Sequence, residues 1–143
     1  DGAGKALIAT PRRTMGCLFG NGVRFGMSHD VVVAGEGIET VLSLRCALPR
    51  LPFVAALSAN HLAALALPSG LRRLYIARDN DRAGFRAAET LTARAEANEI
   101  EAVTLMPVMD DFNTDLRLFG HHGLIQSLHT QFVPEDVARI LRC

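Results

Sequence analysis

The sequence predicts an α/β domain in which a parallel four-stranded sheet is flanked by helices. Four short runs of apolar and β-branched residues alternate with longer stretches whose apolar residues recur at helical spacing. This alternation is typical of parallel strands joined by right-handed crossovers. The length, 143 residues, is close to the usual size of one domain. The predicted strands cover residues 31–34, 53–57, 74–77 and 102–106.

The stretches between and after these strands predict the helices. The clearest helix covers residues 82–98, because Phe85 and Leu91 fall on an apolar face and charged residues occupy the opposite face. The remaining predicted helices cover residues 40–48, 60–67, 124–128 and 135–141.

The beginning of the chain predicts a short β-hairpin ahead of the sheet. Gly20-Asn21-Gly22 lies between two apolar runs, and Asn-Gly in that setting is a strong hairpin signal. Residues 5–26 are therefore interpreted as an antiparallel appendage. The expected organisation is a lead-in segment at 1–29, a sheet domain at 30–120 and a helical extension at 121–143.

The charge balance excludes a protein that grips DNA or an anionic membrane through bulk positive charge. Fifteen Lys and Arg residues match fifteen Asp and Glu residues, so the formal net charge is zero. No apolar run reaches the ~18 residues of a membrane span, and no secretion signal is visible. We expect a cytoplasmic protein with no membrane partner, in which Cys46 is a small buried residue of a helix.

Acidic residues follow three of the four predicted strands. They are Glu36 after the first strand, Asp79 and Asp81 after the third, and Asp111 and Asp115 after the fourth. The carboxyl ends of parallel strands share one edge of the sheet, where ligands bind. Crowded carboxylates stay ionised only beside a cation, and oxygen ligands without His or Cys select Mg²⁺ or Mn²⁺. Each acid taken alone also fits a turn or a helix N-cap.

Two of these segments together resemble the motifs of the Toprim domain family. The first is VVVAGEGIE at residues 31–39, and the second is LYIARDNDRAG at residues 74–84. The family includes bacterial primases, topoisomerases, overcoming-lysogenization-defect nucleases and recombination-mediator proteins. The resemblance covers roughly residues 30–120 and implies a Toprim-like, Rossmann-like fold.

The resemblance also implies roles for the acids. Glu36 corresponds to the motif glutamate, a general base in strand joining and a general acid in cleavage, and Asp79 and Asp81 correspond to the Mg²⁺-binding pair. Asp111 and Asp115 match a later acidic motif, either as ligands of a second metal or only as loop residues. EGIET at residues 36–40 with DDFNTD at 110–115 is most similar to the Toprim module of plasmid, phage and integrative-element primases and primase–helicases.

That similarity implies Mg²⁺-dependent nucleotidyl transfer on nucleic acid, in which a DNA primase or primase–helicase makes RNA primers for replication of a mobile element. The expected partners are a DNA template, nucleoside triphosphates, and a helicase or zinc-binding module in the parent protein. Arg78 and Arg82 flank the acids and either clamp phosphates or form surface ion pairs.

Two alternatives stay open. The same acids could serve a metal-dependent nuclease with water as the nucleophile, or the domain could be a non-catalytic module for DNA binding or assembly. Topoisomerase chemistry needs a tyrosine nucleophile, and the single tyrosine, Tyr75, lies within a predicted buried strand.

Overall fold

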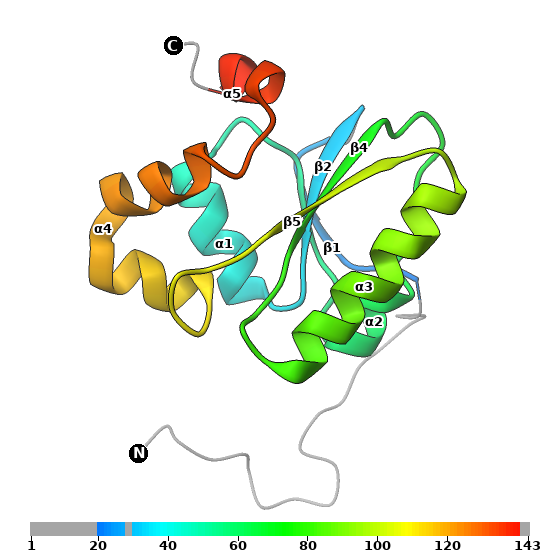
Figure 1. Cartoon of the computed structure of the whole chain (residues 1–143), viewed down its shortest axis with the longest axis horizontal. Helices are drawn as coiled ribbons and strands as arrows, with labels where there is room; N and C mark the ends of the chain where they lie inside the picture. Colours follow the sequence, from blue (N-terminus) through cyan, green and yellow to red (C-terminus); the bar gives the residue numbers. More distant parts are fainter. Residues whose placement is uncertain (1–19, 28–29, 141–143) are drawn as a thin grey trace, which may run out of the picture.

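The computed structural model describes residues 20–27 and 30–140. These residues form a five-stranded sheet with helices on both of its faces (Figure 1). The strands are β1 (Val23–Phe25), β2 (Val31–Gly35), β3 (Phe53–Ala55), β4 (Arg73–Ala77) and β5 (Glu101–Leu105). The helices are α1 (Ile38–Ala47), α2 (Ala59–Ala63), α3 (Arg82–Ala97), α4 (Phe112–His129) and α5 (Pro134–Ile140).

The parallel four-stranded sheet that the sequence predicts is confirmed. The strand order is β1-β3-β2-β4-β5, and the contacts between β3, β2, β4 and β5 are all parallel. Every residue of β2 and of β4 is buried. Burial on both faces explains why these two central strands are continuous apolar runs rather than alternating ones.

The strand that the sequence assigns to a separate appendage extends this sheet instead. β1 pairs antiparallel with β3, so that Val23 lies opposite Ala55. The chain approaches β3 so closely that a Cβ at Gly22 would lie 2.5 Å from the carbonyl oxygen of Ala55, and only glycine fits there. The other strand of the predicted hairpin precedes residue 20 and lies outside the described residues.

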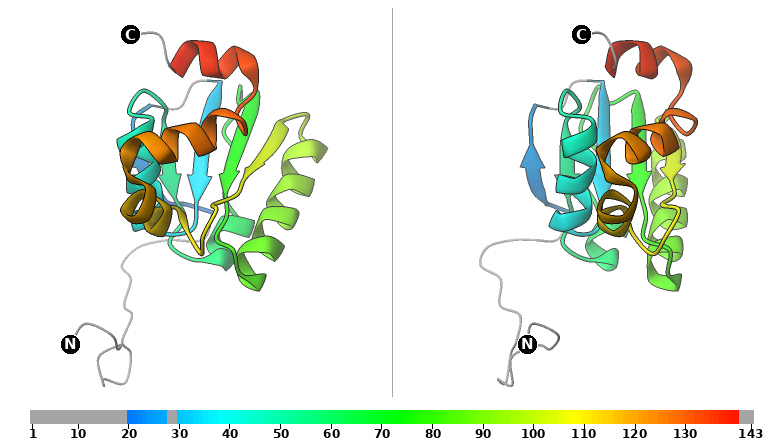
Figure 2. Two further views of the ribbon diagram at one scale, coloured as in Figure 1. Left: turned by 60° about the vertical axis from the view of Figure 1, so that its left-hand side comes forward. Right: turned by 90° about the vertical axis from the view of Figure 1, so that its left-hand side faces the viewer.

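Successive strand residues supply two apolar cores, one on each face of the sheet. Val31 and Val33 pack with α1 and α4, whereas Val32 and Ala34 pack with α2 and α3. Figure 2 shows these two pairs of helices on opposite faces of the sheet. The carboxyl ends of the parallel strands form the edge that carries Glu36, Asp79, Asp81 and Asp111.

The helix α5 lies across the other end of the sheet, at the beginning of the strands (Figure 2). Arg73 donates from Nη1 to Asp136 Oδ2 at 2.7 Å, and the Tyr75 hydroxyl donates to the same oxygen at 2.6 Å. All three side chains are buried. This ion pair with its added hydrogen bond anchors α5 to β4 at the end opposite the acids.

The helix predicted at residues 124–128 is the second half of a longer helix, α4. Helical turns lie on both sides of Gly120, although that residue has φ +70° and ψ −179° and bends the helix. Glycine adopts a positive φ at little cost, which allows the bend. The first half of α4 begins at the fourth strand's acidic loop and therefore contributes to the edge described below.

Helix burial in this fold is one-sided. On α1, Val41, Leu44 and Ala47 are buried, while Cys46 lies on the other side and is exposed. The prediction that Cys46 is buried is wrong, because its position on the helix turns it away from the sheet. Within residues 20–27 and 30–140, no helix combines the length and the apolar character needed to cross a membrane.

Candidate metal centre

Three adjacent parallel strands bring the predicted acids to one edge of the sheet. Gly35 of β2 pairs with Ala77 of β4, which pairs in turn with Leu105 of β5. The chain therefore leaves all three strands at the same level, and the residues that follow share one space. These residues include Glu36 after β2, Asp79 and Asp81 after β4, and Asp111 after β5.

Glu36 places a partly buried carboxylate at this edge. Its Oε2 is buried and has no hydrogen-bond partner among the described residues. Burial raises the pKa of this carboxyl, the charges of Asp79 and Asp81 raise it further, and the backbone N–H of Ala59 lowers it. A buried carboxylate oxygen without a donor is costly unless a ligand satisfies it. A bound cation or a proton would therefore stabilise the Glu36 carboxylate.

Asp79 is the second partly buried acid, and its pKa is also raised. Burial is the main cause, followed by the charges of Asp81 and Asp111, while hydrogen bonds from Thr40 and Glu36 lower the pKa. The Thr40 hydroxyl, buried in the first turn of α1, donates to Asp79 Oδ1 at 3.4 Å. Carboxyl groups from three strand ends are thus close enough to repel one another, and a bound cation relieves such repulsion.

Asp81 caps a helix with one oxygen and keeps the other available. Its Oδ1 accepts a hydrogen bond from the backbone N–H of Gly84 at 2.6 Å, which makes it the N-cap of α3. Among the described residues no hydrogen bond reaches Oδ2, and Asp81 is exposed. Capping and metal binding are therefore compatible roles for this residue, because different oxygens serve them.

Asp111 lies at the border of the cluster. Its Oδ1 accepts from the backbone N–H of Thr114 at 2.7 Å and caps α4, and its charge raises the pKa of Asp79. Asn80 ties the two acidic loops together, because its side-chain amide donates to the carbonyl oxygen of Met109 at 2.5 Å. The loop after β4 and the loop after β5 therefore hold Asp79 and Asp111 in a fixed relation.

Asp115 uses its carboxylate within the loop between β5 and α4. It is fully buried, and its two carboxylate oxygens accept from the backbone N–H groups of Val108 and Met109 at 2.7 and 2.8 Å. Both oxygens are used to shape the loop between β5 and α4. Because backbone N–H groups occupy both oxygens, we do not include Asp115 among the proposed metal ligands.

A family model, described as the Toprim domain, matches residues 31–122. The chain belongs to the Toprim domain family. The matched region contains every acid placed at the edge, and Toprim domains generally bind divalent metals such as Mg²⁺. Family membership supports a metal-dependent nucleic-acid enzyme or binding module.

Similarity to individual proteins is more distant. No curated protein matches this Toprim domain. Among solved structures, it is similar to the zinc-binding and RNA polymerase domains of the Aquifex aeolicus primase, with 18% sequence identity and a TM-score of 0.49. That similarity covers 72% of this chain and 26% of the Aquifex chain, so the Toprim domain spans about a quarter of that protein's structure.

The two predicted phosphate-binding arginines of this Toprim domain have different surroundings. Arg78 is half-buried, donates to the Asp79 carbonyl oxygen at 3.3 Å and lies with Cζ 5.5 Å from the centre of the Phe85 ring. Arg82, in the first turn of α3, is exposed and forms no ion pair within the described part of the chain. Arg82 is therefore available to a ligand at the edge, whereas Arg78 is oriented toward Phe85.

The acids of the Toprim domain fit a hard divalent ion held in an open site. Across the residues that the structure describes, no three His, Cys, Asp or Glu side chains are gathered closely enough to enclose an ion. Mg²⁺ suits such a set, because it keeps several waters and binds through one or two carboxylates together with phosphates. The partly buried carboxyl groups of Glu36 and Asp79, with the second oxygen of Asp81, are the oxygen atoms of this edge that such an ion could use.

Two residues that shape the site were missed in the sequence. The sequence could have indicated that Thr40 is buried, because it lies four positions before Leu44 and therefore on the same, buried side of α1. The role of Leu57 could not be predicted from the sequence, because its φ of +82° is uncommon for a residue with a side chain. The Leu57 N–H donates to the Glu36 carbonyl oxygen at 2.6 Å. This strained turn holds β3 against the residue that carries the key carboxylate.

Proposed function

We propose that this Toprim domain performs Mg²⁺-dependent nucleotidyl transfer on nucleic acid, as the catalytic domain of a DNA primase or primase–helicase. The observation that carries the proposal is the shared edge of Glu36 and Asp79. Both carboxyl groups are partly buried, both have raised pKa values, and one Glu36 oxygen has no hydrogen-bond partner among the residues that the structure describes. A protein keeps such crowded anions where a cation is part of the working state.

Glu36, Asp79 and Asp81 are the residues proposed to supply ligands to Mg²⁺ or Mn²⁺, one or two of them binding the ion directly, and Asp111 lies at the border of this cluster. When bound at these residues, a divalent ion would supply charge neutralisation for the transferred phosphate. The chain contributes the fixed positions: Thr40 holds Asp79 through its hydroxyl, and α3 holds Asp81 through its first N–H groups. Positioning and charge neutralisation account for most of the catalysis of phosphoryl transfer.

Glu36 Oε2 is the proposed acceptor of the proton from the attacking 3′-hydroxyl. Burial is the largest cause of the raised pKa of this carboxyl in the metal-free chain, and a raised pKa favours a general base. The oxygen is free of competing hydrogen bonds in the described residues. Exposed Arg82, one residue after Asp81, is placed to contact phosphate oxygens.

The proposal includes partners that belong to the whole protein. The domain would act on nucleoside triphosphates along a DNA template, beside a helicase or zinc-binding module of the same parent chain. The product would be an RNA primer for the replication of a mobile element, and the reaction would take place in the cytoplasm.

Primer synthesis by the whole protein tests this function directly. Asp79→Asn is expected to abolish Mg²⁺-dependent incorporation of ribonucleotides on a single-stranded DNA template. Asp110→Asn is the matched control, because Asp110 is an exposed neighbour outside the acid cluster, and it should retain activity. Mg²⁺-dependent cleavage of DNA without synthesis would replace the proposal with a nuclease. Full synthesis by Asp79→Asn would contradict it.

A further inference from the structure

A groove runs along the outer side of α3, next to the free edge of β5, and the proposed function does not use it. Its volume is about 470 Å³, within the usual range of roughly 300–1,000 Å³ for small-molecule sites. From Phe85 to Glu96 it follows α3 for about 16 Å, at roughly 1.5 Å per residue. Its lining includes Arg78, Phe85, Glu89, Thr92, Thr104 and Met106.

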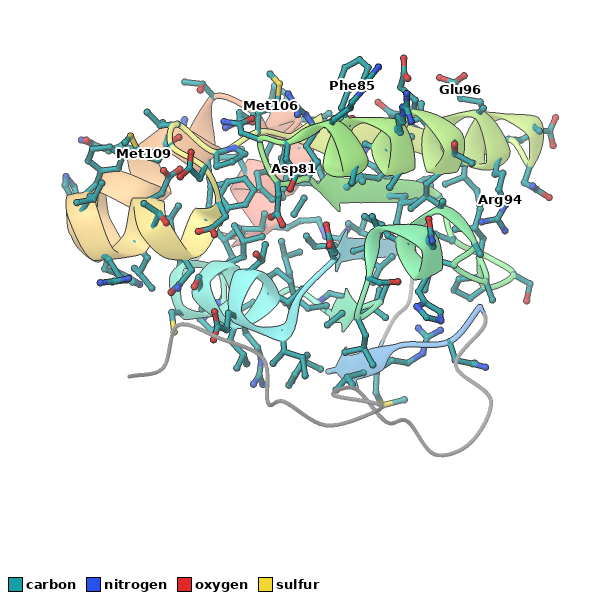
Figure 3. All side chains as sticks on the ribbon, turned by 90° about the horizontal axis from the view of Figure 1, so that it is seen from below. Asp81, Phe85, Arg94, Glu96, Met106 and Met109 are labelled. Atoms are coloured by element: carbon teal, nitrogen blue, oxygen red, sulfur yellow. The ribbon has the colours of Figure 1, made fainter. Side chains whose placement is uncertain are left out.

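The end of the groove nearest the acids exposes a flat aromatic surface. Phe85 and Met106 are each 50% exposed, and Figure 3 shows both on the same outer side of the molecule, with Asp81 further in. The Arg78 guanidinium lies between them, with Cζ 5.5 Å from the Phe85 ring centre and Nη2 3.3 Å from Met106 Sδ. Aromatic rings and guanidinium planes are the surfaces on which nucleobases stack.

This end of the groove is formed by residues that are close in the chain to the acids Asp79 and Asp81. Arg78 directly precedes Asp79, and the backbone N–H of Phe85 donates to the Asp81 carbonyl oxygen at 3.0 Å. Phe85 therefore lies one helical turn after Asp81, at roughly 6 Å. A ligand whose phosphates are held at the acids can reach this surface with the group attached to them.

The charges along the groove indicate which kind of ligand it can bind. The cation Arg78 lies at the end near the acids, whereas Glu89 and Glu96 lie further along α3. A phosphate backbone running through the groove would pass two carboxylates and be repelled. An uncharged base with its ribose would instead contact the apolar side chains of the groove, the Phe85 ring and the hydroxyl groups of Thr92 and Thr104. The charge order thus fits a single nucleotide with its phosphates toward the acids.

We propose that this groove binds the base and ribose of a nucleoside triphosphate whose phosphates lie at the acidic edge, with the base stacked on Phe85. The proposal rests on the proposed function for the position of the phosphates. It makes Phe85, Arg78 and Met106 a nucleoside-binding surface, distinct from the metal ligands.

Calorimetric titration of the chain with two probes in the presence of Mg²⁺ separates the groove from the acids. ATP carries a nucleoside, whereas inorganic tripolyphosphate does not. Phe85→Ala is expected to weaken ATP binding about 5- to 150-fold, the range for loss of one base–aromatic stack, and to leave tripolyphosphate binding unchanged. Asp79→Asn is expected to weaken both. Unchanged ATP binding by Phe85→Ala would overturn the nucleoside groove.

Fluorescence gives a second, independent readout because the chain contains no tryptophan. In Phe85→Trp, ATP with Mg²⁺ should quench the emission and tripolyphosphate should not. Phe119→Trp is the matched control, since Phe119 is 44% exposed on α4 outside the groove, and ATP should leave its emission unchanged. Quenching by hexathymidylate but not by ATP would overturn the proposal in favour of a nucleic-acid strand. Quenching by ATP without any Mg²⁺-dependent binding of tripolyphosphate would overturn the proposed function but would support nucleoside binding in the groove.

Discussion

Gly84 and Asp79 are in such close contact that a Cβ on Gly84 would lie 2.7 Å from the Asp79 carbonyl oxygen. The N–H of Gly84 meanwhile donates to Asp81 Oδ1 at 2.6 Å. The absence of a side chain lets α3 begin directly against the loop that carries both acids. One glycine therefore sets the relative position of the two proposed metal ligands.

Gly84→Ala is expected to lower the free energy of unfolding by about 1–3 kcal/mol, the usual cost of overpacking, and to weaken Mg²⁺ binding. The added methyl group would push the backbone of Asp79 away from α3. Denaturant unfolding and calorimetry measure the two effects. Gly37→Ala is the control, because a Cβ there meets nothing within 4 Å. Equal losses in the two variants would show that crowding at Asp79 is not the cause.

Asp79→Asn is expected to stabilise the metal-free chain at neutral pH. The pKa of Asp79 is raised, so the folded state favours the protonated form, and ionisation above its ordinary value of 3.8 reduces stability. The substitution removes that charge. Thermal unfolding at pH 7 without metal should show a higher Tm than the parent chain, and a lower Tm would contradict the crowding of the acids.

Added Mg²⁺ should stabilise the parent chain and not Asp79→Asn. Binding to the folded state alone adds about 2.7 kcal/mol when the ion is at 100 times its Kd. Asp110→Asn should behave like the parent chain, because Asp110 is exposed and outside the cluster. Mg²⁺ stabilisation that survives in Asp79→Asn would place the ion elsewhere.

Tyr75→Phe is expected to lower stability by about 1–3 kcal/mol, the cost of leaving a buried polar group without its partner. The Tyr75 hydroxyl donates to Asp136 at 2.6 Å and accepts from the Val133 N–H at 3.2 Å, so both would lose a contact. Mg²⁺ affinity should stay unchanged, since this hydroxyl faces α5 rather than the acids. Unfolding and calorimetry on the same samples check both statements, and a loss of Mg²⁺ affinity would contradict the structural role of Tyr75.

Asp30 should contribute stability that is lost in acid. Hydrogen bonding to Arg139 is the main cause that lowers its pKa to about 2. The contribution of Asp30 to the free energy of unfolding is therefore fully present above pH 3.8, the ordinary pKa of an Asp, and disappears as the pH falls to about 2. Unfolding measured at pH 5 and pH 2.5 should show a smaller loss for Asp30→Asn than for the parent chain. An identical loss in both would contradict the ion pair that joins Asp30 to α5.

The sequence was sufficient to predict the parallel sheet and the positions of Glu36, Asp79 and Asp81 directly after its strands. Buried parallel strands are continuous apolar runs, and the residues after them must share an edge, so local pattern carries both inferences. The pairing of β1 with β3 was not readable, because a strand of three residues has little pattern and its partner lies about thirty residues away.

The roles of Asp115 and Arg73 show where local pattern fails. Asp115 has the spacing of a later acidic motif, yet its carboxylate closes a loop through two backbone N–H groups, and that depends on the path of the loop. Arg73 begins a buried strand and finds its partner Asp136 sixty-three residues later. Buried ion pairs between distant residues depend on how the helices pack, which spacing does not encode.

The most direct test of the metal centre is anomalous diffraction from crystals of the chain soaked in Mn²⁺. We expect an ion at the carboxyl ends of β2 and β4, bound by Asp79 and by Glu36 or Asp81 at metal–oxygen distances of about 2.1 Å, near those of Mg²⁺. The same soak of the Asp79→Asn, Asp81→Asn double variant should show no ion there. An ion bound elsewhere in the parent crystals, or retained at this edge in the variant, would show that these acids do not form the metal centre.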